Sequence, residues 1–407
     1  MLVFCIIGLF DVPLRIKNNH YISSKMNHLC LLLLLLLQVL KSMPAYFEDL
    51  KAQLTYPMSW QQNAEAKNFD TWRTETRQAV YDLMGNVPPA PAAYDMTVTD
   101  AERREGYVAY KIEFNISAWE RIPAYLLVPG VPASADLTTI PSSLKPSPAV
   151  VALHDHGAHF TIGKEKMVCP FNVSDEIMAD AKAWADKNYD GAFFGDSLAR
   201  QGYVVLSIDA LFWGDRGRKE GPDYDAQQAL ASNFLQMGTS WGAVINMDDV
   251  RSAEFLASLP FVDAKRIGCC GHSMGGYRSW MLAALTDVIA VSANICWMND
   301  TAHLMTLTNN QNKGGSAYSM LIPGLRNLLD YADVAALACP KPTLFYNGTR
   351  DKLFPVEGVE PAYASMQQVW SSQQVAERLV TQLWDEKHFF NHEQQAQVMQ
   401  FLDRWMK

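Results

Sequence analysis

The sequence predicts an α/β fold, in which a mostly parallel central sheet carries helices on both faces, plus an amino-terminal helical segment. The first observation is a series of nearly continuous apolar runs, which are typical of parallel strands buried on both faces. The second is that helix-like segments separate these runs, as right-handed crossover connections require. The expected strands are 149–154, 203–209, 266–273, 341–348 and 379–384, and the expected helices are 174–188, 192–201, 247–259, 275–286 and 393–406.

The composition is that of an ordinary globular protein. The 407 residues are 49% hydrophobic and 19% charged, which excludes extensive disorder and collagen-like repeats. The formal net charge is -9, whereas a nucleic-acid-binding protein would present a basic face. We therefore expect no nucleic-acid partner.

The amino-terminal region predicts a secretory signal peptide over residues 1–42. The apolar run 29–40 is shorter than the roughly 20 residues that a membrane span needs. Lys25 precedes this run and Ser42 follows it, in the order typical of a cleaved signal. Met26 is an alternative translation start, because the signal is complete from that residue onward. The other interpretation is a buried or membrane-anchoring helix. We expect a secreted or periplasmic protein without stable membrane insertion after the signal is removed.

Two further parts follow the signal. Residues 43–90 form the amino-terminal helical segment, in which helix-like patterning ends near Gly85. Residues 91–407 are expected to form the α/β domain, which begins with half-buried strands at 107–116 and 122–130.

The sequence Gly271-His272-Ser273-Met274-Gly275 predicts a nucleophile. It has the pattern G-x-S-x-G and lies between an apolar strand and a helix. A serine on so sharp a turn needs little steric bulk two positions away on either side, which explains the glycines. The amide of Met274, at the start of the helix, can then donate to a developing oxyanion. The alternative is a glycine-rich turn with an incidental serine.

The acid and the base are expected at Asp351 and His388. In sheets of this class both partners follow the serine in the chain, the acid before the histidine. Asp351 comes just after the strand 341–348, and His388 comes after the next strand. His388 would accept the proton of Ser273, and Asp351 would orient the imidazole. The competing residues are His392, which falls at the start of the last helix, and the acids Glu357, Asp385 and Glu386.

A histidine-rich loop follows the first long strand and reads LHDHGAHF. A loop in this place supplies a second oxyanion donor. The predicted donor is the amide of His156, or that of Ala158 if the alignment shifts by two residues. His154, His156 and His159 also suit a zinc site, but no second cluster with metal-like spacing is evident in the sequence, so we expect no metal. The remaining alternative is that these histidines brace the loop.

Together these motifs resemble the α/β-hydrolase fold, and within it the secreted bacterial esterases of the dienelactone-hydrolase-like and acetyl xylan esterase type. The segments that carry the resemblance are 153–166, 209–218, 246–276, 347–355 and 387–390. The resemblance implies a Ser-Asp-His ester hydrolase without a metal or organic cofactor, acting through an acyl-enzyme on a small-molecule or polysaccharide ester. Dienelactone hydrolases proper use a cysteine where this chain has Ser273, so their substrate class does not transfer.

Three tryptophans are the predicted substrate-binding residues. Trp213, Trp241 and Trp297 lie in segments expected to loop over the carboxyl ends of the strands, where open α/β sheets bind ligands. Their faces suit sugar rings, and the alternative is core packing.

Two charged clusters near these loops have simpler interpretations. Asp215 and Arg216 are expected to form a structural ion pair. Lys164, Glu165 and Lys166 form either a solvated turn or a clamp over the histidine-rich loop.

The leading hypothesis is thus a secreted carboxylic ester hydrolase that removes acetyl or similar small acyl groups from carbohydrate. A serine peptidase of the same fold and a catalytically silent sugar-binding module are the alternatives. The sequence leaves the oligomeric state open.

Overall fold

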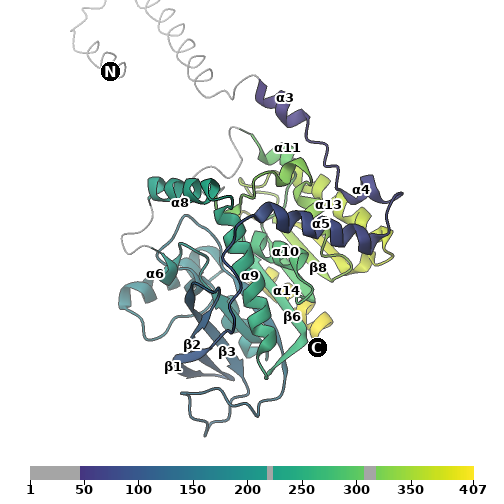
Figure 1. Cartoon of the computed structure of the whole chain (residues 1–407). Coiled ribbons are helices and arrows are strands. Elements are labelled where there is room, and N and C mark those ends of the chain that lie inside the picture. The colour runs from purple at the N-terminus through teal and green to yellow at the C-terminus, as the bar shows by residue number, and fades with distance from the viewer. Residues whose placement is uncertain (1–45, 218–222, 307–317) are drawn as a thin grey trace, which may run out of the picture. The chain divides into compact units, whose positions relative to one another are not determined.

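The computed structural model describes residues 46–217, 223–306 and 318–407 (Figure 1). The predicted signal peptide, residues 1–42, lies outside these ranges. The chain divides into two units, Met1–Gln53 and Leu54–Lys407. The described part of the first unit is dominated by one short helix, α3 (Tyr46–Ala52). No helix in the described ranges is long and apolar enough to cross a membrane.

The second unit is built on one mixed sheet. Its strands lie in the order β1-β2-β3-β5-β4-β6-β7-β8-β9. The pairs from β1 to β5 are antiparallel, and every pair from β5 to β9 is parallel. The predicted mostly parallel α/β sheet is therefore confirmed. The strands are β1 (Thr97–Arg104), β2 (Tyr107–Asn115), β3 (Arg121–Pro129), β4 (Ser147–Leu153), β5 (Val204–Ile208), β6 (Val262–His272), β7 (Val291–Ile295), β8 (Thr343–Gly348) and β9 (Leu379–Trp384).

Helices cover both faces of this sheet (Figure 1). Alternate side chains of β4 show the division: Val151 belongs to the core under α5, α9, α10, α12 and α13, whereas Val150 belongs to the core under α6, α7 and α14. This alternation follows from the two-residue period of a strand. The helices are α4 (Trp60–Asn63), α5 (Phe69–Met84), α6 (Asp175–Asn188), α7 (Phe194–Arg200), α8 (Tyr224–Gln236), α9 (Trp241–Ser258), α10 (Met274–Leu285), α11 (Thr301–Leu304), α12 (Tyr331–Ala336), α13 (Val356–Ser372) and α14 (His392–Met406).

The amino-terminal helices of the second unit join the same core. Trp72 on α5 is buried, and its ring lies 5.4 Å from that of Trp60 on α4. The indole of Trp60 donates to the hydroxyl of Ser372 at the end of α13, 2.9 Å away. Arg77 on α5 donates to the carbonyl of Ala284 on α10 at 2.8 Å. These contacts attach α4 and α5 to the helical layer that also holds α10.

The parallel strands β4, β6, β8 and β9 all end at one edge of the sheet. Each is followed by a predicted site segment: the histidine-rich loop, Ser273, Asp351 and His388. The topology therefore brings together residues that are more than 200 positions apart in the sequence.

Candidate active site

Ser273 occupies a strained turn between β6 and α10. Its backbone angles are φ 56° and ψ −124°, a conformation that residues with a side chain rarely adopt. The flanking glycines make this turn possible, because a Cβ on Gly275 would overlap the carbonyl oxygen of Leu153 on β4, and one on Gly271 would overlap Gly275. The predicted elbow geometry is thus present.

The structure gives each polar group of the turn a defined environment. The amide of Ser273 donates to the carbonyl of Ile295 on β7 at 2.8 Å, which fixes the turn to the sheet. The half-buried hydroxyl of Ser273 makes no hydrogen bond within the described ranges. The amide of Met274 is the first of α10, and first-turn amides have no acceptor inside their own helix. The Met274 N–H is therefore available to an oxyanion.

Asp351 and His388 are hydrogen-bonded to each other. Asp351 Oδ2 accepts from His388 Nδ1 at 2.6 Å, and Asp351 Oδ1 accepts from the amide of Leu353 at 2.8 Å. The Asp351 carboxylate is fully buried, while 23% of the His388 side chain is exposed. Burial lowers the pKa of His388, but the charge and hydrogen bond of Asp351 outweigh it and leave that pKa above its ordinary value. The Asp351 carboxylate thus increases the affinity of the His388 imidazole for a proton.

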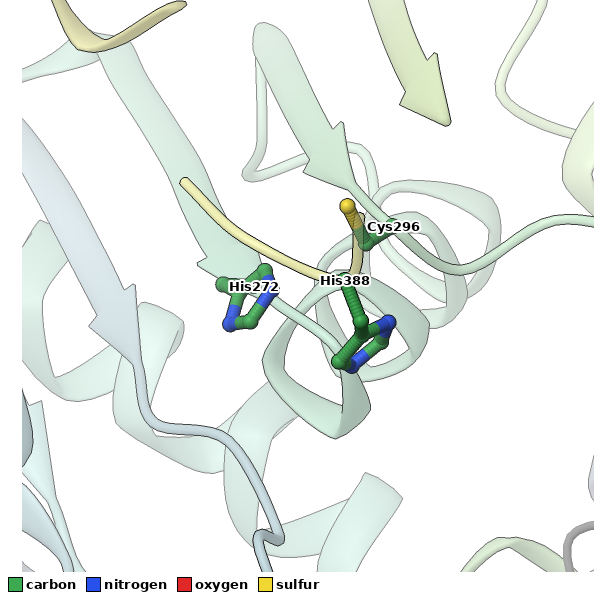
Figure 2. Close-up of side chains that lie close together, drawn as sticks. All are labelled: His272, Cys296 and His388. Atoms are coloured by element: carbon green, nitrogen blue, oxygen red, sulfur yellow. The ribbon is translucent and has the colours of Figure 1, made fainter. Parts of the chain in front are cut away.

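The His388 ring lies beside the elbow. Its centroid is 4.8 Å from that of His272, the residue before Ser273 (Figure 2). The ring of Phe354 stacks on that of His388, with centroids 5.9 Å apart. No hydrogen bond joins the Ser273 hydroxyl to His388 among the described residues. Such bonds are often long before substrate binds and tighten in the complex. Phe354, three residues after Asp351, was not singled out from the sequence, where it is one apolar residue among many.

His272, Cys296 and His388 are close enough to be considered as metal ligands. One donor atom from each lies within 4.8 Å of the others. However, His388 Nδ1 is already engaged by Asp351, and the Cys296 thiol donates to the carbonyl of Phe389 at 3.7 Å. Neither nitrogen of buried His272 has a hydrogen-bond partner within the described ranges, and burial lowers its pKa to about 3. The arrangement therefore favours a neutral His272 packed against the Asp351–His388 pair over a metal centre.

The three histidines of the loop after β4 have separate roles. His154 Nδ1 donates to the carbonyl of Asp155 at 2.8 Å, and its Nε2 accepts from the amide of Ala210 at 2.9 Å, which ties the loop to the one after β5. His159 pairs with Asp180 at 2.7 Å on the surface. His156 Nδ1 accepts from a backbone amide of its own loop. These contacts agree with histidines that brace the loop.

The two predicted donors of this loop differ in availability. The amide of Ala158 donates to His156 Nδ1 at 2.9 Å and is therefore occupied. The amide of His156 has no acceptor in the part of the chain that the structure describes. Leu153 on β4 pairs with Gly271 on β6. Asp155 and Ser273, each two residues further along the chain, therefore follow the ends of neighbouring strands. Of the two alternatives, the His156 amide remains available beside the elbow.

The solvated-turn interpretation of Lys164, Glu165 and Lys166 is wrong. All three are buried, in the short 3-10 helix η1 (Lys164–Lys166). Lys164 pairs with Asp209 at 2.8 Å, and Lys166 donates to two backbone carbonyls of the histidine-rich loop. A short sequence rich in charge gives no sign of such burial, because the partners come from other loops.

The expected ion pair between Asp215 and Arg216 is also wrong. Asp215 pairs with Lys164 at 2.6 Å, whereas Arg216 pairs with Glu120 at 2.7 Å and with Asp248 at 2.9 Å. Both residues lie in the 3-10 helix η2 (Gly214–Arg216), where consecutive side chains point in different directions.

The structure places the three predicted tryptophans in the core. Trp213 and Trp241 pack in a buried, mostly aromatic cluster that includes Met274, with ring centroids 5.5 Å apart. Trp297 packs against Phe354 at 5.2 Å. None of the three is more than 2% exposed, so none presents a face on which a sugar ring could stack as it stands. Their position matches the core-packing alternative, in which they support the loops around the elbow.

The sheet order, the serine elbow after β6 and the acid–histidine pair after β8 and β9 define an α/β-hydrolase fold. The chain belongs to the Abhydrolase family, whose model matches residues 42–382. The predicted resemblance is thereby confirmed at the level of the fold and the family.

Known proteins of similar sequence or structure agree with this assignment. The YtaP protein of Bacillus subtilis, assigned by name as a hydrolase, is 27% identical over 334 residues, which are 82% of this chain and all of that protein. A Bacteroides fragilis structure assigned as an acetyl xylan esterase has a TM-score of 0.58 at 18% identity, covering 78% of this chain and 75% of that one. A glucuronoyl esterase from Solibacter usitatus has a TM-score of 0.58 at 13% identity, covering 84% and 94%.

Proposed function

We propose that the protein is a secreted serine carboxylic ester hydrolase, with Ser273 as nucleophile, His388 as base and Asp351 as the orienting acid. The observation that carries the proposal is the 2.6 Å hydrogen bond between Asp351 and His388, located beside the strained turn of Ser273. An imidazole held this way next to a strained serine has the components of nucleophilic catalysis.

The reaction would proceed in two halves. His388 Nε2 takes the hydroxyl proton as Ser273 Oγ attacks the ester carbonyl, and the amides of Met274 and His156 bind the resulting oxyanion. Collapse breaks the bond to the alcohol, which leaves with the proton from His388, and the acyl group remains on Ser273. Water then attacks the acyl-enzyme, His388 takes its proton, and the acid is released with Ser273 regenerated. Every proton is carried by His388, so these steps need no metal or organic cofactor.

For the substrate we propose an acetyl or similar small acyl ester of a carbohydrate, either a small molecule or a polysaccharide. The support is indirect: proteins of the same fold include an assigned acetyl xylan esterase and glucuronoyl esterases. Export through the predicted signal peptide would bring the enzyme to such substrates in the periplasm or outside the cell.

The decisive experiment compares the wild-type protein with Ser273→Ala on 4-nitrophenyl acetate. We expect the wild type to turn over and the variant to lose at least about 10³-fold in kcat. Ser279→Ala is the matched control, because Ser279 lies on the same helix and its hydroxyl donates to the carbonyl of Gly275 rather than facing the substrate. Unchanged turnover in folded Ser273→Ala would contradict the assignment.

Two further measurements separate the alternatives. A fluorophosphonate should label Ser273 in an active serine hydrolase, whereas a silent sugar-binding module would stay unlabelled. Cleavage of dipeptide amides without cleavage of acetates would identify a peptidase instead. A panel of acetylated, methyl-glucuronoyl and feruloyl sugars then identifies the acyl group and the alcohol.

A further inference from the structure

A buried ammonium group lies directly behind the loop that holds the second oxyanion donor. The side chain of Lys166 is 0% exposed, and its Nζ donates to the carbonyl of Asp155 at 3.0 Å and to the carbonyl of His156 at 3.1 Å. Two consecutive carbonyls therefore converge on one cation. In an extended strand successive carbonyls point in opposite directions, so the backbone at this point is turned.

The direction of these carbonyls fixes the direction of two amides. The peptide bonds after Asp155 and His156 are trans, and in a trans peptide the N–H points opposite to the C=O. The N–H groups of His156 and Gly157 are consequently directed away from Lys166. Neither amide has an acceptor within the described ranges. Successive free amides of this kind form a concave anion-binding site.

Lys166 is not needed merely to satisfy these carbonyls. The Asp155 carbonyl also accepts from His154 Nδ1, and the His156 carbonyl also accepts from the indole of Trp213 at 3.3 Å. The carboxylate of Asp155 is likewise bound by the hydroxyl of Tyr189 at 2.6 Å. Burying a charge is costly, and the ammonium of Lys166 also forms an ion pair with the buried carboxylate of Asp155, whose Oδ1 lies 3.5 Å from Nζ. Lys166 adds a positive charge, which attracts both carbonyl oxygens and polarises the two peptide groups.

We propose that Lys166 is a positioning residue of the oxyanion site, which holds the Asp155 and His156 carbonyls so that the amides of His156 and Gly157 face the acyl oxygen of an ester on Ser273. This inference rests on the proposed esterase function. It adds the Gly157 amide as a donor, and it gives a role to a lysine that touches neither the substrate nor the triad.

Lys341 provides a matched control. It is also a buried lysine whose Nζ donates to two backbone carbonyls, those of Ala283 at 2.7 Å and Thr286 at 2.6 Å. These carbonyls lie at the carboxyl end of α10, whose 12 residues separate them from Ser273 by about 18 Å. Lys341→Met therefore removes a similar set of contacts without altering the oxyanion loop.

The experiment measures kcat, KM and thermal unfolding for Lys166→Met and Lys341→Met on 4-nitrophenyl acetate. We expect Lys166→Met to lose about 10- to 100-fold in kcat with KM changed less than about 3-fold, because a misplaced oxyanion donor affects the transition state and not substrate binding. Affinity for a trifluoromethyl ketone, which forms an oxyanion on the serine, should fall in parallel. Lys341→Met should keep kcat within about 2-fold even where its unfolding temperature falls.

Conservative variants keep the test decisive. Lys166→Arg retains the charge and should recover part of the kcat that Lys166→Gln loses, and this pair replaces Lys166→Met if that variant does not fold. A kcat for Lys166→Met or Lys166→Gln within about 3-fold of wild type would overturn the inference while leaving the esterase assignment intact. A wild type with neither turnover nor fluorophosphonate labelling would overturn the esterase assignment, and this inference with it.

Discussion

Asp351 and His388 meet because the strands that precede them are paired in register. Gly348 at the end of β8 pairs with Trp384 at the end of β9, and the two side chains follow three and four residues later. The 2.6 Å hydrogen bond between Asp351 Oδ2 and His388 Nδ1 is thus a consequence of parallel strand pairing. The acid and the base are positioned by the sheet itself, not by a flexible loop alone.

Replacing Asp351 by asparagine should cost activity far more than stability. The amide oxygen can still accept from the Leu353 N–H, but the amide nitrogen would face Nδ1 of His388 and favour the wrong tautomer. We expect kcat of Asp351→Asn to fall by about 10³- to 10⁴-fold, as is typical of triads that lose their acid. The measurement is steady-state kinetics together with urea unfolding.

Asp385→Asn is the control for this substitution. Asp385 is close in the sequence to His388, but its side chain is 87% exposed and pairs with the exposed Arg350. We expect its kcat to match the wild type. If Asp351→Asn kept activity and Asp385→Asn lost it, the acid would have to be reassigned.

The pH profile should reflect the environment of His388. Because the carboxylate of Asp351 outweighs burial, the pKa of His388 lies above its ordinary value of 6.5, so the ring is protonated at a higher pH than a free histidine. A protonated base has no lone pair for the proton of Ser273. We therefore expect kcat/KM to fall on the acid side with a midpoint above 6.5. A profile that stays flat down to pH 4 would exclude His388 as the base.

Four of the strands that the sequence predicted share one property. β4, β5, β6 and β8 are nearly continuous apolar runs, and burial on both faces produces that pattern. The central strand β7 was not predicted, because it contains buried Ser292 and Asn294. The side-chain nitrogen of Asn294 donates to the carbonyl of Leu344 on β8 at 2.9 Å and to the hydroxyl of Ser292 at 3.3 Å. Edge strand β1 was missed because none of its 8 residues is buried, so the sequence has no apolar run there.

Prediction of the site from the sequence is limited in a similar way. The elbow around Ser273 could be predicted because its glycines are a local steric requirement, visible in five consecutive residues. The partners of Lys164 and Arg216 could not be predicted, since they lie more than about 30 residues away in the chain, at Asp209, Glu120 and Asp248. Buried charges depend on three-dimensional proximity, and a single sequence records no such proximity. The same limit applies to Trp213, whose buried place in the core is set by tertiary packing.

The glycine after Met274 is expected to be essential for the elbow. A Cβ at Gly275 would overlap the backbone of Leu153, and backbone atoms of a central strand have little room to move. We expect Gly275→Ala to lose about 1–3 kcal/mol of stability and most of its activity, because α10 would have to shift away from β4. Urea unfolding and kinetics measure the two effects. Wild-type values for both would show that the close approach of α10 to β4 is not required.

Breaking the buried ion pair between α9 and α10 should reduce the free energy of unfolding more than breaking an exposed ion pair. Arg278 is fully buried and binds Asp249 through Nε at 2.9 Å and Nη2 at 2.6 Å. Removing Arg278 leaves a buried carboxylate whose pKa burial already raises, so we expect Arg278→Met to lose about 3–5 kcal/mol of unfolding free energy. Adding Asp249→Leu should recover part of this loss, since no charge then stays unpaired. Arg350→Met, at an exposed pair, should change stability by less than about 1 kcal/mol. Equal losses for Arg278→Met and Arg350→Met in urea unfolding would contradict this account.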